Sequence, residues 1–261
     1  MSSLLLIGYG NMGSAMLSSW QKNPPYGIAD FYIIEPNHSA GGMFFQTLAE
    51  FPGNIKPDII IFAVKPQQLA AILPVYQKRF GGEPLYISIA AGKTLGFFAG
   101  YLGAGAKIIR AMPNTPALVG KAITALCANK NISASHKATA TALVQSFGKA
   151  VWVEEKLMDA VTAVSGSGPA YVFLFLESLT KAAINVGLET ETAKTLALET
   201  LHGSVHLATK SNDSFGQLRE NVTSKGGTTE AALNILMNNN ALENLLEEAV
   251  QAAITRAKSL A

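Results

Sequence analysis

A change in hydrophobic pattern near residue 159 constrains the fold of this 261-residue chain more than any other feature. Before it, longer mixed segments separate short runs that are rich in β-branched residues and mostly apolar throughout: 3–8, 31–35, 58–64, 85–90, 107–112, 122–127 and 150–153. Strands that are buried on both faces of a mostly parallel sheet have this pattern, and helices cover the faces of such a sheet. The pattern predicts an α/β domain over residues 1–158.

After residue 159 the strand-like runs disappear. Segments 170–188, 190–210, 214–222 and 228–261 are helical by composition, and in the last one Leu242, Leu245, Leu246 and Ala249 recur at helical spacing. We therefore expect an all-helical domain over residues 159–261.

Composition excludes several classes of protein. A net charge of only +2 argues against a nucleic-acid binder that neutralises phosphates. The single cysteine, Cys127, allows no intrachain disulfide, and in a strand-like run it is expected to be a core residue. The longest apolar runs fall short of the ~18 residues of a membrane span, and no basic segment precedes the first run, so we expect a soluble cytoplasmic protein.

The first strand runs directly into the glycine pattern Gly8-x-Gly10-x-x-Gly13. In a dinucleotide-binding turn the first glycine allows a tight turn, the second lets the backbone approach a pyrophosphate, and the third lets the helix pack on the strand. A helix-compatible segment follows, and the second strand ends in Glu35, near the spacing of about 20 residues expected for an acid on the ribose hydroxyls. An ordinary glycine turn is the alternative.

Polar residues follow two other predicted strands. Lys65 and Pro66 come after the third strand, and two prolines hold Asn114 and Thr115 rigidly after the fifth. Ligands bind at the carboxyl ends of strands in such sheets, so these residues are candidates for cofactor contacts. A solvated lysine and a stiff turn are the structural alternatives.

Two glycine-rich loops interrupt the helical half. One is the segment SGSGP at 165–169, which is also typical of a hinge with a helix cap. The other is VTSKGGTT at 222–229, where the amides of Gly226 to Thr229 can point at one spot and form an anion nest at a helix start. A carboxylate suits that nest.

A metal site is the weaker interpretation of a third group. Glu199, His202 and His206 can share one helix face, but the zinc pattern H-E-x-x-H is absent from the sequence. Surface or core histidines are expected instead.

Five segments together resemble pyrroline-5-carboxylate reductase, the last enzyme of proline synthesis. They are GYGNMG, AVKPQ, RAMPNTP, AVSGSGPAYVF and NVTSKGGTTEAAL, and they occur in this order along the whole chain. The first is shared with many dehydrogenases, whereas the last two are highly specific.

The resemblance implies hydride transfer from a nicotinamide cofactor to the C=N carbon of Δ1-pyrroline-5-carboxylate, giving L-proline. It implies that Ser224 and the backbone from Gly226 to Thr229 clamp the substrate carboxylate, with the Thr229 hydroxyl at the ring nitrogen. The implied site has catalytic residues Thr229 and Ser224, substrate-binding residues Gly226, Gly227, Thr228, Ser165, Ser167 and Gly168, and cofactor-binding residues Gly8, Gly10, Asn11, Met12, Gly13, Glu35, Val64, Lys65, Pro66, Asn114 and Thr115. Relatives form dimers through the helical domain and often larger rings.

Two positions depart from the family pattern. Lys225 stands where many relatives have proline, and Glu35-Pro36 ends the second strand. NADPH is the family default, but a carboxylate repels a 2′-phosphate and favours the free ribose of NADH, while Asn37, His38 and Ser39 could still hold a phosphate. The choice stays open.

Two other functions compete with this assignment. One is a β-hydroxyacid dehydrogenase, for which Lys181 would have to serve as the catalytic lysine. The other is a dinucleotide sensor without turnover.

Overall fold

The computed structural model describes residues 2–25 and 27–259. The chain divides into two compact units, which are described separately. The first runs to Ser167 and also takes in the chain from Ala253 onward, and the second is Gly168–Ala252.

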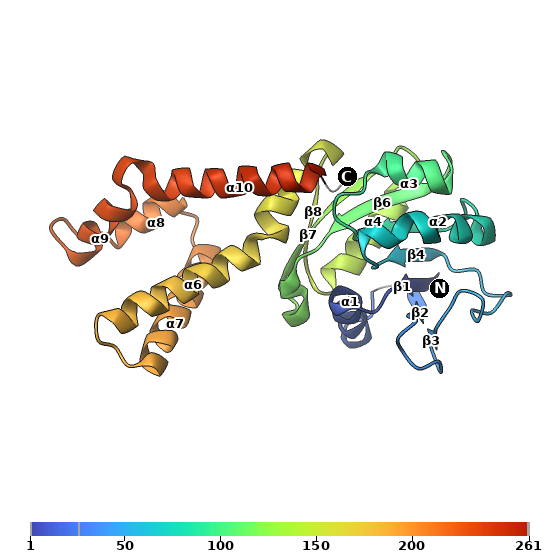
Figure 1. Cartoon of the computed structure of the whole chain (residues 1–261), viewed down its shortest axis with the longest axis horizontal. Coiled ribbons are helices and arrows are strands. Elements are labelled where there is room, and N and C mark those ends of the chain that lie inside the picture. The colour runs from blue at the N-terminus through green and yellow to red at the C-terminus, as the bar shows by residue number, and fades with distance from the viewer. Residues whose placement is uncertain (1, 26, 260–261) are drawn as a thin grey trace. The chain divides into compact units, whose positions relative to one another are not determined.

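The first unit is built on an eight-stranded sheet with the order β3-β2-β1-β4-β5-β6-β7-β8 (Figure 1). All neighbouring strands are parallel except β6 and β7, which are antiparallel. The strands are β1 Ser2–Ile7, β2 Ile28–Ile34, β3 Phe44–Phe45, β4 Ile59–Phe62, β5 Leu85–Ser88, β6 Lys107–Met112, β7 Ala122–Ala128 and β8 Gly148–Trp152.

Helices cover both faces of the sheet, which is why its central strands are apolar throughout. One core layer contains Leu4 and Leu6 of β1 with helices α1 (Asn11–Lys22) and α4 (Ala134–Gln145). The other contains Leu5 and Ile7 of the same strand with α2 (Pro66–Phe80) and α3 (Leu95–Leu102). Short helical segments complete the unit: η1 Thr115–Val119, η2 Glu155–Leu157, α5 Met158–Val161 and the π-helical turn η3 Thr162–Gly166.

The second unit is helical. It contains α6 Gly168–Asn185, α7 Thr190–Lys210, α8 Phe215–Asn221, α9 Thr228–Leu236, η4 Asn238–Asn240 and the start of α10 Ala241–Ser259. The fold class expected from the sequence, an α/β domain followed by helices, is confirmed. The single helical segment predicted at 228–261 is wrong in one respect: left-handed φ values of 50° and 56° at Asn239 and Asn240 break it into α9 and α10.

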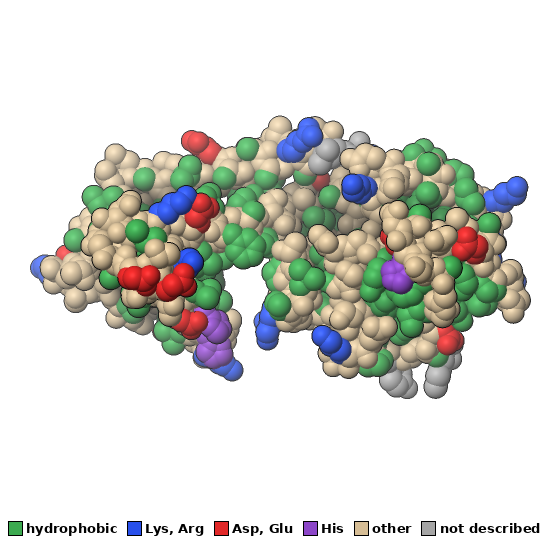
Figure 2. All heavy atoms as spheres, turned by 60° about the horizontal axis from the view of Figure 1, so that its bottom comes forward, with side chains coloured by type: hydrophobic (Ala, Val, Ile, Leu, Met, Phe, Trp, Pro, Cys, Tyr) green, Lys and Arg blue, Asp and Glu red, His purple; other side chains and the backbone are tan. Residues whose placement is uncertain are grey.

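Among its described residues the second unit buries almost nothing: Ala193 and Ala197 alone are in the buried class. Large apolar side chains are exposed instead, including Phe173 at 65% and Phe215 at 81%. Figure 2 shows such hydrophobic side chains on the surface of the helices. Helices with so small a core have apolar surface to bury against something else.

One helical stretch, Glu155–Asn185, is long and apolar enough to cross a membrane by length and composition, and 6% of its most apolar window is buried. A single stretch of this kind is weak evidence, because the helices of soluble proteins pass the same test. The expectation of no membrane association stays a prediction.

Candidate active site

The glycine turn between β1 and α1 has the geometry that its spacing predicts. A Cβ on Gly8 would lie 2.8 Å from the Ala63 carbonyl oxygen, and one on Gly13 would lie 2.4 Å from the Gly8 carbonyl oxygen. Both positions therefore need glycine for packing. A Cβ on Gly10 would meet nothing within 4 Å, so at this position the backbone borders open space.

The first turn of α1 is free to receive an anion. Gly10 is the N-cap residue. Because glycine has no side chain, the helix has no side-chain cap among the described residues. The amides of Asn11, Met12 and Gly13 begin the helix at this end. Amides and helix dipole together favour phosphate there.

A cavity of about 780 Å³ opens beside the glycine turn. Its walls come from the ends of β1, β2 and β4 and from α2. They include five of the predicted cofactor residues: Gly8, Gly10, Glu35, Val64 and Lys65. Asn11, Met12, Gly13, Pro66, Asn114 and Thr115 do not line it. This size and this place at the carboxyl edge of a parallel sheet suit a nucleotide.

Glu35 is held against the glycine turn. Its Oε2 accepts a hydrogen bond from the Tyr9 amide at 2.8 Å, and its Oε1 accepts one from the Asn37 amide at 3.1 Å. The described residues include no cation in an ion pair with Glu35. The carboxylate therefore lines the cavity without a paired cation among these residues.

Three aromatic residues gather at the same end of the site: Tyr9 and His38 line the cavity, and Phe44 packs against both. Of these the sequence singled out only His38, as a possible phosphate contact. His38 stacks on Phe44 with ring centroids 3.9 Å apart, and Tyr9 meets both rings edge-on. Phe44 belongs to β3, a strand of two residues that is too short to give a period-2 signal. Burial raises the pKa of Tyr76, another lining residue, so its phenol stays neutral.

Lys65 and Pro66 lie at the start of α2. Pro66 takes the first helical turn, and the Lys65 amide donates to Gln68 Oε1 at 3.3 Å. The Lys65 side chain is exposed at the cavity wall. It is the one lysine or arginine among the described lining residues.

Asn114 is a structural clamp in the first unit. Its Nδ2 donates to the Ser165 carbonyl at 3.1 Å, and its Oδ1 accepts from the Ile123 amide at 3.0 Å. The neighbouring Thr115 is exposed. Asn114 thereby ties the π-helical turn η3 to β7, and the Ser167 amide closes that turn on the Thr162 carbonyl at 2.8 Å. π-Helical turns are frequent at functional sites.

The loop at 222–227 and the start of α9 form the other predicted site, in the second unit. Ser224, Gly226, Gly227, Thr228 and Thr229 are brought together there, because Gly226 adopts a left-handed φ of 73° and Gly227 is the N-cap of α9. Ser224 Oγ lies over Gly227, where a Cβ would approach it to 2.5 Å.

The structure provides no support for the metal interpretation. His202 Nδ1 and Glu199 Oε2 lie 3.8 Å apart, and no group of three or more His, Cys, Asp and Glu that could hold a metal ion exists among residues 2–25 and 27–259. Cys127 is buried in β7, and burial raises the pKa of its thiol to about 11, so it is a core residue as expected.

The glycine turn, the acid after β2 and the cavity between them define a Rossmann-type nicotinamide oxidoreductase with a helical second unit. Residues 155–260 match the family model for pyrroline-5-carboxylate reductase dimerisation. Pyrroline-5-carboxylate reductase of Haemophilus influenzae is 36% identical over 98% of this chain and 97% of its own length. The Pseudomonas aeruginosa enzyme is 40% identical over 78% and 75%.

Solved structures agree with these relatives. The pyrroline carboxylate reductase of Plasmodium falciparum, with NADP bound, has a TM-score of 0.88 at 34% identity and covers 99% of this chain and 98% of its own. The Coxiella burnetii enzyme has the same score and identity over 100% and 98%. This chain belongs to the pyrroline-5-carboxylate reductase family, as its motifs predict, and is an NAD(P)H-dependent oxidoreductase. The hydroxyacid dehydrogenase alternative is set aside, and its candidate Lys181 forms an exposed ion pair with Glu177 at 2.6 Å.

Proposed function

We propose that this protein reduces Δ1-pyrroline-5-carboxylate to L-proline. The observation that carries the proposal is the pair of sites in a member of this family: a glycine turn that borders open space at Gly10, and a loop that gathers Ser224 and Thr229 at a helix start. The same pair is what the motifs of the sequence predict.

The residues of the first unit suit a dinucleotide, since the backbone at Gly10 borders open space that a Cβ at this position would enter. Gly8, Gly10, Asn11, Met12 and Gly13 would hold its pyrophosphate. Val64, Lys65, Pro66, Asn114 and Thr115 are proposed to border its nicotinamide half. When bound, the nicotinamide supplies the hydride.

The residues of the second unit would bind and orient the substrate. Ser224 and the loop formed by Gly226, Gly227 and Thr228 bind its carboxylate, and the Thr229 hydroxyl holds the ring nitrogen. Ser165, Ser167 and Gly168 are proposed to border the ring. Orientation supplies much of the rate enhancement, because an iminium that already carries its proton needs no general acid.

An assay with purified protein, pyrroline-5-carboxylate and reduced cofactor tests the proposal. We expect cofactor oxidation, and we expect Thr229→Ala to lose turnover while it keeps cofactor affinity. Cofactor binding without any turnover would instead support a dinucleotide sensor.

We further propose that NADH is preferred over NADPH. The support is the Glu35 carboxylate, which two backbone amides hold at the cavity and which no cation neutralises within the described chain. Two like charges at close range in a partly desolvated site repel each other, so the 2′-phosphate of NADPH is disfavoured. Glu35→Ser should raise kcat/KM for NADPH relative to NADH at least tenfold; an unchanged ratio would contradict the role of Glu35.

The helical part, residues 159–261, is proposed to bind substrate and to form a homodimer that can extend to rings, while residues 1–158 bind the dinucleotide. The exposed apolar side chains of α6 support a dimer interface. A cytoplasmic enzyme without membrane or nucleic-acid partners is proposed, and light scattering together with cell fractionation tests both statements.

A further inference from the structure

In the loop of residues 222–227, here called the substrate loop, some of the backbone amides of the predicted anion nest donate hydrogen bonds to other groups of the protein. The Gly226 amide donates to Glu230 Oε2 at 2.6 Å, and the Gly227 amide donates to the Ser224 carbonyl at 3.0 Å. Two of the amides that the sequence offers to a ligand are therefore already bonded within the protein. The amides that follow, those of Thr228 and Thr229, begin α9, which has no side-chain cap in the described chain.

Glu230 reaches backward to make its contact. It is the third residue of α9, and its carboxylate bonds the amide of the residue that precedes the N-cap. In the usual capping box the third residue bonds the N-cap amide itself. Here that amide is taken by Ser224, so the carboxylate holds the residue at which the chain turns left-handed, Gly226 with φ 73°.

We propose that Glu230 is a positioning residue for the substrate loop. Its charge-assisted hydrogen bond fixes Gly226, and Gly226 in turn places Ser224 and the amides of Thr228 and Thr229 for the substrate carboxylate. This inference rests on the proposed function of the loop. It also assigns the carboxylate to the Ser224 hydroxyl and the amides of Thr228 and Thr229, with Gly226 serving as structure.

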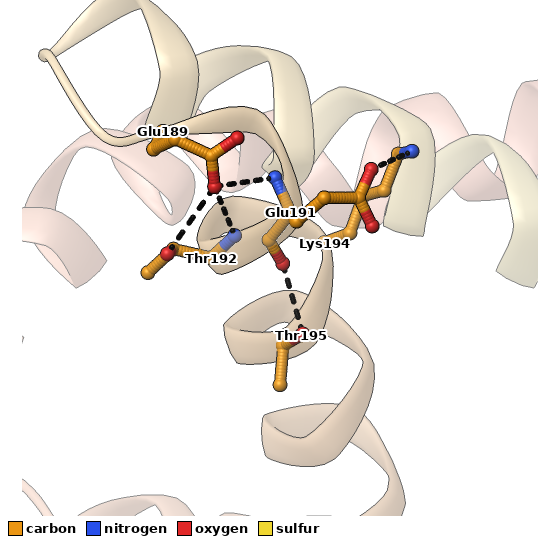
Figure 3. A network of polar contacts seen from close by, with 5 residues as sticks. All are labelled: Glu189, Glu191, Thr192, Lys194 and Thr195. Carbon is orange, nitrogen blue, oxygen red and sulfur yellow. Dashed lines mark hydrogen bonds and ion pairs between the residues drawn. The ribbon is translucent and has the colours of Figure 1, made fainter.

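A second capping glutamate in the same unit shows how different this arrangement is. Glu189 is the N-cap of α7, and its Oε2 accepts from the amides of Glu191 and Thr192 at 2.9 and 3.1 Å (Figure 3). That carboxylate bonds the first amides of its own helix. The Glu230 carboxylate instead secures the preceding loop and leaves the first amides of α9 without a side-chain partner among the described residues.

The experiment compares Glu230→Ala, Glu230→Gln and the matched control Glu189→Ala. For Glu230→Ala we expect KM for pyrroline-5-carboxylate to rise at least tenfold, kcat to change less than about threefold, and the Kd for NADH to stay unchanged. Glu230→Gln keeps an acceptor oxygen, so it should return KM to within about threefold of wild type. Glu189→Ala should lower Tm as a lost helix cap does and leave KM unchanged.

Each other outcome is informative. An unchanged KM in Glu230→Ala overturns the proposal, as does an equal rise in Glu189→Ala, which would indicate general loosening of the helices. Failure of Glu230→Gln to rescue also overturns it, because a hydrogen-bond acceptor would then not be what the loop needs. If the wild-type protein itself does not oxidise NADH or NADPH with this substrate, the proposed function fails first.

Discussion

Replacing Gly10 with alanine separates ligand binding from folding in the glycine turn. Gly10 has φ −71° and ψ −167°, which alanine adopts without strain, and the added Cβ would meet no atom within 4 Å. Alanine restricts the unfolded chain, which stabilises by about 0.4–1 kcal/mol, but it is a poorer N-cap than glycine by up to about 1 kcal/mol. The two effects nearly cancel, so Tm should change by less than about 3 °C.

Cofactor affinity should respond differently. The methyl group of Gly10→Ala projects into the space where the backbone must approach a pyrophosphate, and a loss of about 1.4 kcal/mol corresponds to a tenfold weaker Kd. We expect at least that loss for NADH, measured by quenching of protein fluorescence or by calorimetry. A Kd within twofold of wild type would refute the close approach of the backbone at this position.

Gly13→Ala is the matched comparison, since its Cβ would lie 2.4 Å from the Gly8 carbonyl oxygen. The group that the Cβ would meet is a backbone carbonyl, so the contact cannot be relieved by turning a side chain. Overpacking of this kind costs about 1–3 kcal/mol, so Tm should fall by roughly 2–12 °C and affinity should fall with it. Comparing the two variants shows whether affinity for the cofactor can fall while the stability of the protein is kept.

Three other perturbations give distinct outcomes. Burial lowers the pKa of His136, whose Nδ1 accepts a hydrogen bond from the Ser133 amide. As pH drops below about 6.5 the unfolded state takes up the proton first, so the free energy of unfolding falls. His136→Gln should flatten this loss in denaturation curves measured between about pH 7 and pH 5. Glu155→Gln leaves the buried Arg110 without its carboxylate and should cost about 1–3 kcal/mol in urea unfolding, and adding Arg110→Met should recover part of that cost. Phe173→Asp should shift the protein toward smaller species in sedimentation if α6 forms the proposed dimer interface, and an unchanged mass would place the interface elsewhere.

The parts of the fold that could be predicted are those where the immediate surroundings of a residue permit only one type of side chain. The long apolar runs become strands because helices cover both sheet faces, and Gly8 and Gly13 are needed because carbonyl groups lie where their Cβ atoms would be. Such demands act over a few residues and are visible in the sequence.

The features that escaped prediction depend on contacts between distant or exceptional positions. Arg110 pairs with Glu155 across 45 residues at 2.7 Å, and nothing in either neighbourhood signals the pair. The break between α9 and α10 rests on two left-handed asparagines with no glycine to mark it. The two hydrogen bonds by which the Asn114 side chain joins the Ser165 carbonyl to the Ile123 amide are likewise not visible in the prolines around it.

In the substrate loop, the sequence motif does not show which backbone amides bond within the protein and which remain for a ligand. The sequence indicates that the amides of Gly226 to Thr229 can converge, but it does not show which of them the protein keeps for itself. Glu230 and Ser224 decide this by bonding the first two amides, so the amides left for a ligand are those two residues further along, at the start of α9. The two glycines then fix the shape of the loop, and in our proposal carboxylate binding depends on Glu230, the residue that directly follows the two threonines of the motif.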